Sequence, residues 1–368
     1  MIRVGITGQN GFIGYHVTQH LRLEPDKYEI IPFERDAFED EAKLEAFVAS
    51  CDKIIHLAAM NRGDEQEIYQ TNISLVQKLI SAMENAGVTP QILFSSSTQE
   101  TRGNLYGNSK KEGASLFWKW AEENNAVFSH FIIPNVFGPF GRPYYNSVTA
   151  TFCHQLTHNE TPVINVDAEM TLIYVGDLAK EFVAHLEDTA SAVISPQPVS
   201  TITVSGLLAK LEEFKTWYFE NGMIPPLANS FEVNLFNTFR SYANDIMPIH
   251  AKLNTDPRGT FFELIREKGG GQVSFSTTVP NETRGNHYHM RKIERFCVVK
   301  GKALIQTRRV GTDVIHNYEV SGDKPAFIDM PVYYTHNIKN IGDEELLTFF
   351  WINEFFNPED SDTYHEVV

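Results

Sequence analysis

The stretch that decides the fold of the first half of the chain is Ile2-Arg-Val-Gly-Ile-Thr-Gly8-Gln-Asn-Gly11-Phe-Ile-Gly14. Its apolar beginning predicts a strand, and an amphipathic helix is expected from about Tyr15. Between them, Gly8 permits a sharp turn, Gly11 lets backbone approach a pyrophosphate, and Gly14 allows helix and strand to pack closely. The amides at the helix start would face the phosphates with a favourable dipole. The stretch therefore predicts a dinucleotide-binding α/β domain with a Rossmann-like, doubly wound parallel sheet.

The second strand is expected at Tyr28-Glu-Ile-Ile-Pro-Phe33. Residues at the end of this strand normally determine whether NAD or NADP binds. Glu34 lies about 20 residues past the last glycine, where a carboxylate would bind the ribose hydroxyls and favour NAD. Arg35 stands beside it and could instead meet a 2'-phosphate, which would favour NADP. These residues alone leave the choice open.

Two further stretches carry the candidate catalytic residues of this half. Gln91-Ile-Leu-Phe-Ser95-Ser-Ser97 predicts a buried strand, and a helix is expected to open near Tyr106. Tyr106 and Lys110 are four positions apart and therefore share one face of that helix. We expect the lysine charge to lower the pKa of the phenol, so that Tyr106 exchanges protons near neutral pH. Ser97 would hydrogen-bond the same substrate oxygen, so the predicted catalytic residues are Ser97, Tyr106 and Lys110.

A third strand, expected at Asp52-Lys-Ile-Ile-His56, ends in small residues that let backbone pack close to a cofactor. The residues expected to line the dinucleotide site are Gly8, Asn10, Gly11, Phe12, Ile13, Gly14, Arg35, Leu57, Ala58, Ala59, Tyr106 and Lys110.

Length and composition exclude several classes of protein. At 368 residues the chain is long enough for two domains with full hydrophobic cores. No apolar run is long enough for a membrane span and no signal-like leader opens the chain, so a cytoplasmic protein is expected. Cys51, Cys153 and Cys297 are scattered and predict reduced core residues. The formal charge of -16 argues against a nucleic-acid partner.

A domain boundary is expected where the chain changes character, around residue 245. Residues 200–245 predict a helical, aromatic subdomain, whereas Pro248, Pro257 and Gly259 follow as breakers. Beyond them come short alternating strands, such as those expected at 272–276 and 302–306. This pattern is typical of a small antiparallel barrel. The predicted domains are therefore residues 1–245 and 246–368.

The second domain carries a candidate metal site. His287 and His289 are two positions apart, so on a strand their imidazoles project from the same face. Glu294 follows after a short turn, and His336 would join from a second strand. Three imidazoles and one carboxylate suit a divalent ion such as zinc, with room left for water or substrate. The pattern leaves open which metal binds and whether it is catalytic or structural.

The first domain resembles the extended short-chain dehydrogenases/reductases that act on nucleotide sugars. The resemblance is carried by Thr7 to Gly14, His56-Leu-Ala-Ala, Ser95-Ser-Ser, Tyr106-x3-Lys110 and Ile133-Pro-Asn135. It implies that Lys110 holds the nicotinamide ribose, that Asn135 contacts substrate and that residues from about 140 to 245 cover the nucleotide sugar. The familiar Val-Tyr-Gly after the serines is absent, and a very short connection leads into Tyr106.

The second domain resembles the cupin family, which implies an all-β jelly-roll barrel. Its two motifs are present as His-x-His-x4-Glu-x6-Gly from His287 and Pro-x-Tyr-x2-His-x3-Asn from Pro331. Asn281 and Tyr333 replace two glycines of the family motifs, while every ligand position is met.

The same domain also resembles the metal-free cupins that epimerise dTDP-4-keto-6-deoxyhexoses. Residues 254–263, with Asp256-Pro-Arg258-Gly, and residues 283–288 carry this resemblance. In those enzymes the histidine matched by His287 is the catalytic base. Since one imidazole cannot easily be both base and metal ligand, the base stays open between His287, Glu294 and Tyr333 or Tyr334.

Over its whole length the chain resembles the bifunctional capsule-precursor enzymes of the CapF type. The resemblance implies that the cupin domain inverts C3 of a UDP-2-acetamido-2,6-dideoxy-4-hexulose, and that the other domain reduces C4 with NADPH. The product would be UDP-N-acetyl-6-deoxy-L-talosamine, on the route to UDP-N-acetyl-L-fucosamine. Arg284 is a candidate contact for this substrate, and a homodimer through the cupin domain is expected. The alternatives are a reductase with a non-catalytic, dimerising metallo-cupin, and an iron-dependent oxygenase cupin fused to a cofactor-binding scaffold.

Overall fold

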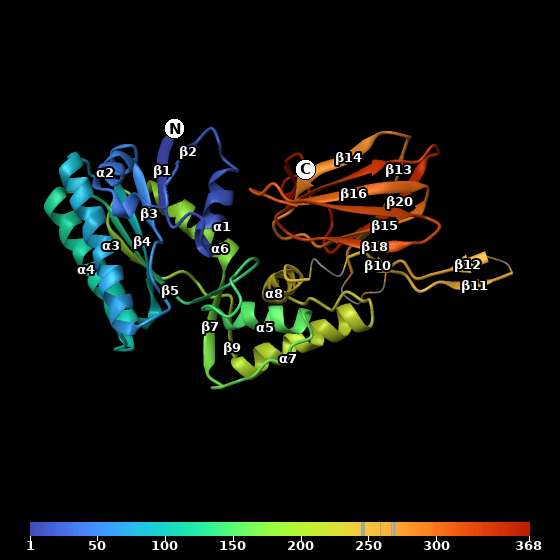
Figure 1. Cartoon of the computed structure of the whole chain (residues 1–368), viewed down its shortest axis with the longest axis horizontal. Helices are drawn as coiled ribbons and strands as arrows, with labels where there is room; N and C mark the ends of the chain where they lie inside the picture. Colours follow the sequence, from blue (N-terminus) through green and yellow to red (C-terminus); the bar gives the residue numbers. More distant parts are fainter. Residues whose placement is uncertain (244–246, 258, 266, 268–269) are drawn as a thin grey trace. The chain divides into compact units, whose positions relative to one another are not determined.

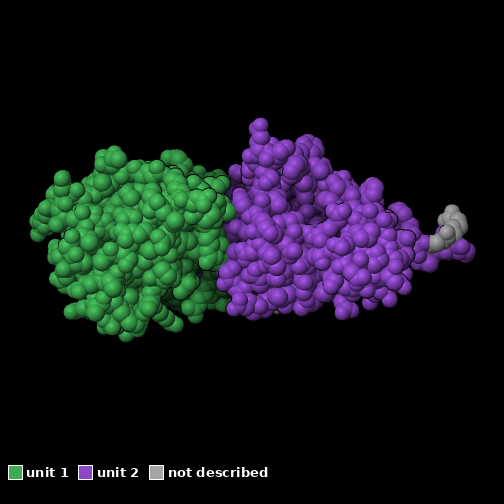
Figure 2. Space-filling model, turned by 90° about the horizontal axis from the view of Figure 1, so that it is seen from above, with its two compact units in different colours: residues 1–148, 168–203 green, residues 149–167, 204–368 purple. Residues whose placement is uncertain are grey.

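The computed structural model describes residues 1–243, 247–257, 259–265, 267 and 270–368. Arg258, part of the Asp256-Pro-Arg258-Gly motif, lies outside these residues. Two compact units make up the chain: residues 1–148 with 168–203, and residues 149–167 with 204–368 (Figure 2). Among the described residues, no helix has both the length and the apolar character that crossing a membrane requires.

The first unit is built on a six-stranded sheet in the order β2-β1-β3-β4-β5-β8, in which every pair of neighbours is parallel (Figure 1). The strands are β1 (Ile2–Thr7), β2 (Tyr28–Ile31), β3 (Lys53–His56), β4 (Gln91–Ser97), β5 (Phe128–Ile133) and β8 (Ala192–Ile194). The helices are α1 (Phe12–Leu21), η1 (Ala37–Glu39), α2 (Glu41–Ala49), α3 (Glu65–Ala86), η2 (Thr98–Thr101), α4 (Leu105–Asn124), α6 (Val175–Ala184) and η3 (His185–Glu187). The expected Rossmann-like sheet is therefore confirmed.

Helices cover both faces of this sheet because its central strands are apolar on both sides. One core joins the sheet to α2, α3 and α4, through side chains such as Phe47, Leu79 and Phe117. The other joins it to α1 and α6, through side chains such as Leu21 and Phe182. A small sheet of β6 (Asn135–Phe137), β7 (Glu169–Tyr174) and β9 (Ser200–Thr203) completes the unit.

The second unit contains two antiparallel sheets of five strands, in the orders β10-β18-β15-β20-β13 and β17-β16-β19-β14-β21. The strands are β10 (Ile249–His250), β13 (Gln272–Thr278), β14 (Thr283–Tyr288), β15 (Glu294–Lys300), β16 (Lys302–Arg309), β17 (Ile315–Ser321), β18 (Ala326–Met330), β19 (Tyr334–Asn340), β20 (Leu346–Ile352) and β21 (Tyr364–His365). A separate hairpin is formed by β11 (Asn254–Asp256) and β12 (Gly259–Phe261). Apolar side chains of both sheets, including Val298, Ile305 and Ile338, share one core. This is the expected cupin-like β domain.

The second unit also includes helices that the sequence assigned to the first domain. They are α5 (Val148–Thr157), α7 (Val204–Lys215), a π-helical turn (Thr216–Glu220) and α8 (Ser230–Arg240). By compactness, the chain thus divides differently from the boundary expected at residue 245.

Buried polar contacts explain this difference. Arg295 of β15 and Asp329 of β18 form a bidentate ion pair with distances of 2.7 and 2.9 Å. The hydroxyl of Tyr218, in the π-helical turn, donates to the same carboxylate. In addition, Asn237 Nδ2 of α8 donates to the Arg291 carbonyl at 2.7 Å. These polar groups are buried, so each needs a hydrogen-bond or ion-pair partner within the protein. Because the partners lie on both the helices and the barrel, the helices pack with the barrel.

Candidate functional sites

A cavity of about 1080 Å³ lies at the carboxyl ends of β1, β3, β4 and β5 in the first unit. This is the edge where open parallel sheets bind their ligands. The side chains and backbone that line it are Gly8, Gln9, Asn10, Gly11, Phe12, Ile13, Gly14, Phe33, Arg35, Phe38, Leu57, Ala58, Ala59, Asn61, Ser97, Thr98, Gln99, Arg102, Tyr106, Pro134, Asn135, Val136, Phe140, Gly141, Arg142, Tyr145, Asn146 and Ser147. All residues predicted for the dinucleotide site are among them except Lys110.

The glycine turn forms the floor of this cavity as the sequence predicts. Gly8 has a φ of +78°, a conformation that favours glycine. A Cβ on Gly14 would lie 2.3 Å from the Gly8 carbonyl oxygen, so only glycine fits there. Helix α1 begins at Phe12, and no side chain caps its N-terminus. The first amides of α1 are therefore available to an anionic ligand.

The structure separates Glu34 from Arg35. The Glu34 carboxylate lies 2.8 Å from the Lys43 ammonium of α2 and does not line the cavity. Asp36 lies at the same distance from Lys43 and shares that ammonium. Arg35 does line the cavity, so it is the charged residue of the Glu34–Arg35 pair that borders this space.

Tyr106 and Lys110 occupy the first turns of α4, as predicted, but only Tyr106 reaches the cavity. Lys110 is 4% exposed, and its Nζ donates to the Ser95 carbonyl at 2.8 Å. Burial lowers the pKa of Lys110 to about 8, although the Glu100 carboxylate opposes this shift. Lys110 therefore lies beneath the cavity rather than in its wall.

The expected lowering of the Tyr106 pKa is wrong in this structure. Burial of the phenol raises its pKa to about 12. The Lys110 ammonium lies 5.9 Å from the centre of the Tyr106 ring, so its attraction does not offset the loss of water around the hydroxyl. Tyr106 consequently keeps its proton at neutral pH.

Ser97 and Asn135 also lie where the sequence predicts, at the cavity wall. Ser97 Oγ accepts from the Gln99 amide at 3.2 Å and thereby caps the 3-10 turn η2. Asn135 Nδ2 donates to the Thr171 carbonyl at 3.3 Å. Sequence reasoning missed Arg102 and Arg142, two cationic residues of the same wall. The Gly141-Arg142-Pro sequence after the Asn135 strand was the available signal for Arg142.

In the second unit, the structure brings together the four predicted metal-binding side chains. Each of His287, His289, Glu294 and His336 offers one ligand atom, and these atoms all lie within 4.8 Å of one another. The pairing of β14 with β19 sets His287 opposite His336, and the turn after β14 returns the chain to Glu294 at the start of β15. The Glu294 Oε2 lies 3.2 Å from His289 Nε2 and 3.1 Å from His336 Nε2.

The electrostatics of this cluster are those of a ligand set. Burial raises the pKa of Glu294, but the neighbouring His289 and His336 outweigh it and hold that pKa below its usual range. Burial, helped by the two other histidines, lowers the pKa of His287 to about 4. At neutral pH the site therefore presents a carboxylate and a neutral His287 imidazole, as a divalent ion requires. Burial lowers the pKa of His289, but the contacts with Glu294 and Asp362 outweigh it and raise that pKa, so a metal would displace a proton from His289.

The donor set fits zinc. His336 is 1% exposed, and its Nε2 has no well-directed hydrogen-bond partner among the described residues. Its Nδ1 faces the Tyr334 carbonyl at 3.2 Å, and the Nδ1 of His289 faces the Asp362 carbonyl at 2.6 Å. Because a carbonyl only accepts, each Nδ1 donates to it, so each Nε2 is the nitrogen left to bind a metal. The proton with which His289 Nε2 donates to Glu294 would be displaced by that metal.

The two positions where this chain departs from the cupin motifs have backbone conformations that favour glycine. Asn281 has a φ of +68° and Tyr333 a φ of +61°, both in the left-handed region. Tyr333 N donates to the His289 carbonyl at 2.7 Å, so its backbone supports the cluster. Both Tyr333 and Tyr334 are buried. Arg284, the predicted substrate contact, is exposed and its Nε donates to Thr278 Oγ1 at 3.2 Å.

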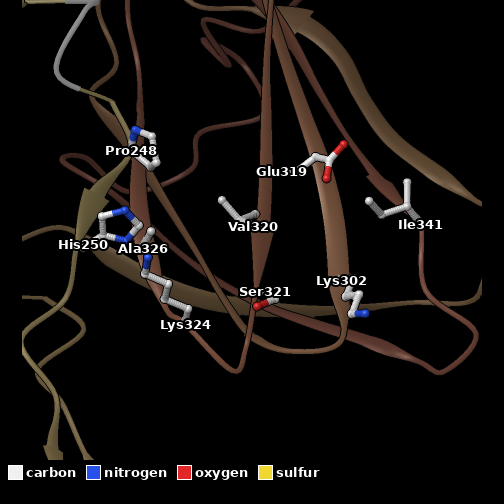
Figure 3. A pocket seen from close by; sticks show the side chains of 9 residues that line it. All are labelled: Pro248, His250, Lys302, Glu319, Val320, Ser321, Lys324, Ala326 and Ile341. Atoms are coloured by element: carbon white, nitrogen blue, oxygen red, sulfur yellow. The ribbon is translucent and has the colours of Figure 1, made fainter.

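A second, shallower pocket of about 370 Å³ lies in the second unit (Figure 3). It is lined by Pro248, His250, Lys302, Glu319, Val320, Ser321, Lys324, Ala326 and Ile341. Lys302 begins β16 and Ile341 follows the end of β19, whereas Glu294 begins β15 and His336 lies near the start of β19. The pocket therefore lies at the far end of the strands from the histidine cluster.

The cavity and its glycine turn define the class of the protein: an enzyme that binds a nicotinamide dinucleotide on a Rossmann-like sheet. Residues 4–195 match the model of the NAD dependent epimerase/dehydratase family, and residues 254–364 match that of the polysaccharide biosynthesis C-terminal domain. Neither match includes residues 196–253, so the boundary at residue 245 stays a prediction.

Two relatives match the chain over its whole length. The UDP-2-acetamido-2,6-beta-L-arabino-hexul-4-ose reductase of Pseudomonas aeruginosa is 33% identical over 99% of this chain and 98% of its own. The capsular polysaccharide assembling protein CapF of Staphylococcus aureus has 37% identity, covers both chains fully and superposes with a TM-score of 0.66. The chain therefore belongs to the NAD dependent epimerase/dehydratase family, and within it to the CapF type.

The Rossmann-like fold is also shared with more distant structures. RMD of Pseudomonas aeruginosa, solved with NADPH, has 17% identity, covers 67% of this chain and 100% of its own, and has a TM-score of 0.57. At this identity the likeness concerns the fold alone.

Proposed function

We propose that this chain is a bifunctional UDP-sugar enzyme: the barrel epimerises C3 of a UDP-2-acetamido-2,6-dideoxy-4-hexulose, and the Rossmann-like domain then reduces the C4 ketone with NADPH. The product would be UDP-N-acetyl-6-deoxy-L-talosamine, in a route to UDP-N-acetyl-L-fucosamine for capsular polysaccharide, and the site of action the cytoplasm. The observation that carries the reductase half is the position of Tyr106 in the wall of a cavity floored by the glycine turn, where burial raises the pKa of its phenol. The name of the Pseudomonas aeruginosa relative supports the class of substrate.

In the reduction, the bound cofactor supplies a hydride to C4. Tyr106 then donates its proton to the oxygen that develops negative charge. Its raised pKa suits this role because the phenol stays protonated until the alkoxide forms. Ser97, in the same wall, would orient the carbonyl, and Asn135 would contact the sugar. Lys110, beneath the cavity, would supply a positive charge toward the nicotinamide ribose of a bound cofactor.

NADPH is the proposed cofactor because Arg35 lines the cavity and Glu34 does not. An NAD-type site uses a carboxylate to bind the ribose hydroxyls, but the Glu34 carboxylate is engaged by Lys43. Arg35 lines the cavity and carries the charge that attracts a 2'-phosphate.

Epimerisation must precede reduction because only a ketone acidifies its neighbouring carbon. Removing the C3 proton gives an enolate whose charge moves to the C4 oxygen, and protonation on the other face inverts C3. Zinc held by His287, His289, Glu294 and His336 would supply a Lewis acid to that oxygen. The base stays open between His287, Glu294 and Tyr333 or Tyr334. A purely structural metal is the alternative, with the barrel as a non-catalytic dimerisation module.

Solvent deuterium separates the two functions. The full chain is incubated with the 4-keto sugar in D2O without NADPH, and C3 is followed by NMR. Deuterium at C3 supports the epimerase, whereas an unlabelled C3 contradicts it. If C3 stays unlabelled and NADPH is still oxidised, the protein is a reductase with a non-catalytic barrel.

A further inference from the structure

The carboxyl-terminal segment of the chain closes over the turn that joins two of the proposed ligands. His289 and Glu294 are separated by the short turn 290–293, and Asp362 lies against it. Asp362 is 3% exposed and has a φ of +42°, so a charged residue is buried in an unusual backbone conformation. A buried carboxylate needs compensating partners.

Three successive backbone amides provide those partners. The Asp362 carboxylate accepts from the amides of Met290 at 3.1 Å, Arg291 at 3.0 Å and Lys292 at 2.9 Å. Consecutive amides that converge in this way form an anion-binding concavity, and here the anion comes from the chain itself. The carboxylate therefore fixes the shape of the turn between the two ligands.

The backbone of the same residue orients His289. The Asp362 carbonyl oxygen lies 2.6 Å from His289 Nδ1 and can only accept, so the proton sits on Nδ1. His289 Nε2 then faces the cluster, where it donates to Glu294 Oε2 at 3.2 Å, and it is the nitrogen that a metal would take in place of that proton. Asp362 thus acts on one ligand through its main chain and on the turn through its side chain.

The segment around Asp362 is itself anchored on both sides. Lys292 Nζ donates to the Ser361 carbonyl at 2.5 Å. After Asp362, β21 pairs with β14 and sets His365 opposite His287. The anchored tail gives Asp362 little freedom to leave the turn.

Resting on the proposed metal site, we infer that Asp362 is a positioning residue of that site, which orients His289 and fixes its separation from Glu294. The Asp362 carboxylate is taken up by the turn amides and is not one of the four proposed ligands. The tail that carries it is accordingly part of the metal centre and not an appendage of the barrel.

The test is zinc affinity in the full-length chain, measured by competition with a chromogenic chelator. Asp362→Ala is expected to weaken zinc binding by about 10- to 100-fold. The matched control is Asp360→Asn, an exposed neighbour whose carboxylate contacts the side chain of Arg291. It is expected to bind zinc as the unaltered chain does. Cobalt substitution adds a spectral readout, because a displaced His289 changes the visible bands.

Equal affinity in Asp362→Ala and Asp360→Asn would overturn the inference and leave the metal site standing. A chain that binds no zinc before any substitution overturns the metal site and the inference with it. If Asp362→Ala does not fold, the His289 tautomer of the unaltered, zinc-loaded chain decides by nitrogen NMR. A proton on Nδ1 supports the inference, and a proton on Nε2 refutes it.

Discussion

At the scale of single residues, substitution of Tyr106 is expected to separate the two proposed activities. Tyr106→Phe removes the proton donor for the C4 oxygen but leaves the cavity shape nearly unchanged. We expect NADPH oxidation to fall by about 10²- to 10⁴-fold, while exchange of the C3 hydrogen with D2O continues. Tyr145→Phe, also in the cavity wall, is the control and should retain both activities. Loss of both activities in Tyr106→Phe would contradict the division of labour.

Arg35 is expected to select the cofactor. Arg35→Ala should raise the KM for NADPH by at least about tenfold and leave the KM for NADH little changed, since only NADPH carries the 2'-phosphate. Steady-state kinetics with each cofactor make the comparison. Arg22→Ala, an exposed arginine after α1, serves as the control for loss of one surface charge. Equal effects on both cofactors would count against the assignment.

The basic limb of the reductase pH profile is expected to report on Lys110. Its pKa is lowered to about 8 by burial, so as the pH rises through that value the lysine loses its charge and activity should fall. Glu100 opposes the lowering. His56, which also lies near Lys110, stays uncharged because burial and Lys110 lower its pKa to about 3, and Tyr106, 5.9 Å from the ammonium, stays protonated because burial raises its pKa to about 12.

Glu100→Gln should therefore shift this basic limb to lower pH. Glu112→Gln, at an exposed carboxylate on α4, the helix that carries Lys110, should not move it. An unchanged limb in Glu100→Gln would show that Lys110 does not set it.

Particular residues show what sequence can and cannot reveal at this scale. The four metal-site side chains could be predicted because strand alternation and motif spacing fix where they point. Asp362 could not, since its role depends on where the tail folds back. The direction of the Tyr106 pKa shift was predicted wrongly because the burial of its hydroxyl depends on the whole cavity. The effect of this burial on the pKa outweighs that of the lysine charge one helical turn away.

At the scale of elements, the π-helical turn Thr216–Glu220 is expected to hold the helices onto the barrel. Tyr218 is fully buried, and its hydroxyl donates to the Asp329 carboxylate that pairs with Arg295. Tyr218→Phe leaves this buried carboxylate one donor short, so we expect a loss of about 1.5–3 kcal/mol in the free energy of unfolding.

Urea unfolding measures this loss. Tyr364→Phe, in the same unit and packed against Tyr288, controls for removal of a tyrosine hydroxyl outside the buried network. Equal midpoints for the two variants would mean that the network does not stabilise the unit.

The helices and strands themselves were largely predictable, because the spacing of apolar residues along the sequence follows the period of each kind of element. The strands β1, β3 and β4 and the helices α1 and α4 lie where those periods indicate. The packing of α7 and α8 was not predictable, since breakers at Pro248 and Pro257 mark a change of local structure and say nothing about contacts. Buried partners such as Tyr218 and Asp329 decide that packing.

At the scale of the whole molecule, the outer strand β13 points to how two copies would meet. It pairs with β20 on one side and ends its sheet on the other. Val273 and Phe275 are 56% and 64% exposed, and Phe275 packs on Phe349 of the neighbouring strand. An apolar edge strand of this kind can pair with another chain through its unpaired backbone groups and its exposed apolar side chains.

We therefore expect a homodimer through the cupin-like domain, and Phe275→Lys should raise its dissociation constant by at least about tenfold by placing a charge in the contact. Light scattering across a concentration series measures this constant. Val166→Lys, at another exposed valine of the same unit, should leave it unchanged. A chain that is monomeric before substitution, or a Phe275→Lys variant that stays equally dimeric, would refute this interface.

If the dimer forms through β13, the histidine cluster stays intact in the monomeric variant, because its four side chains come from β14, β15, β19 and the turn between β14 and β15. Deuterium exchange at C3 should then survive dissociation.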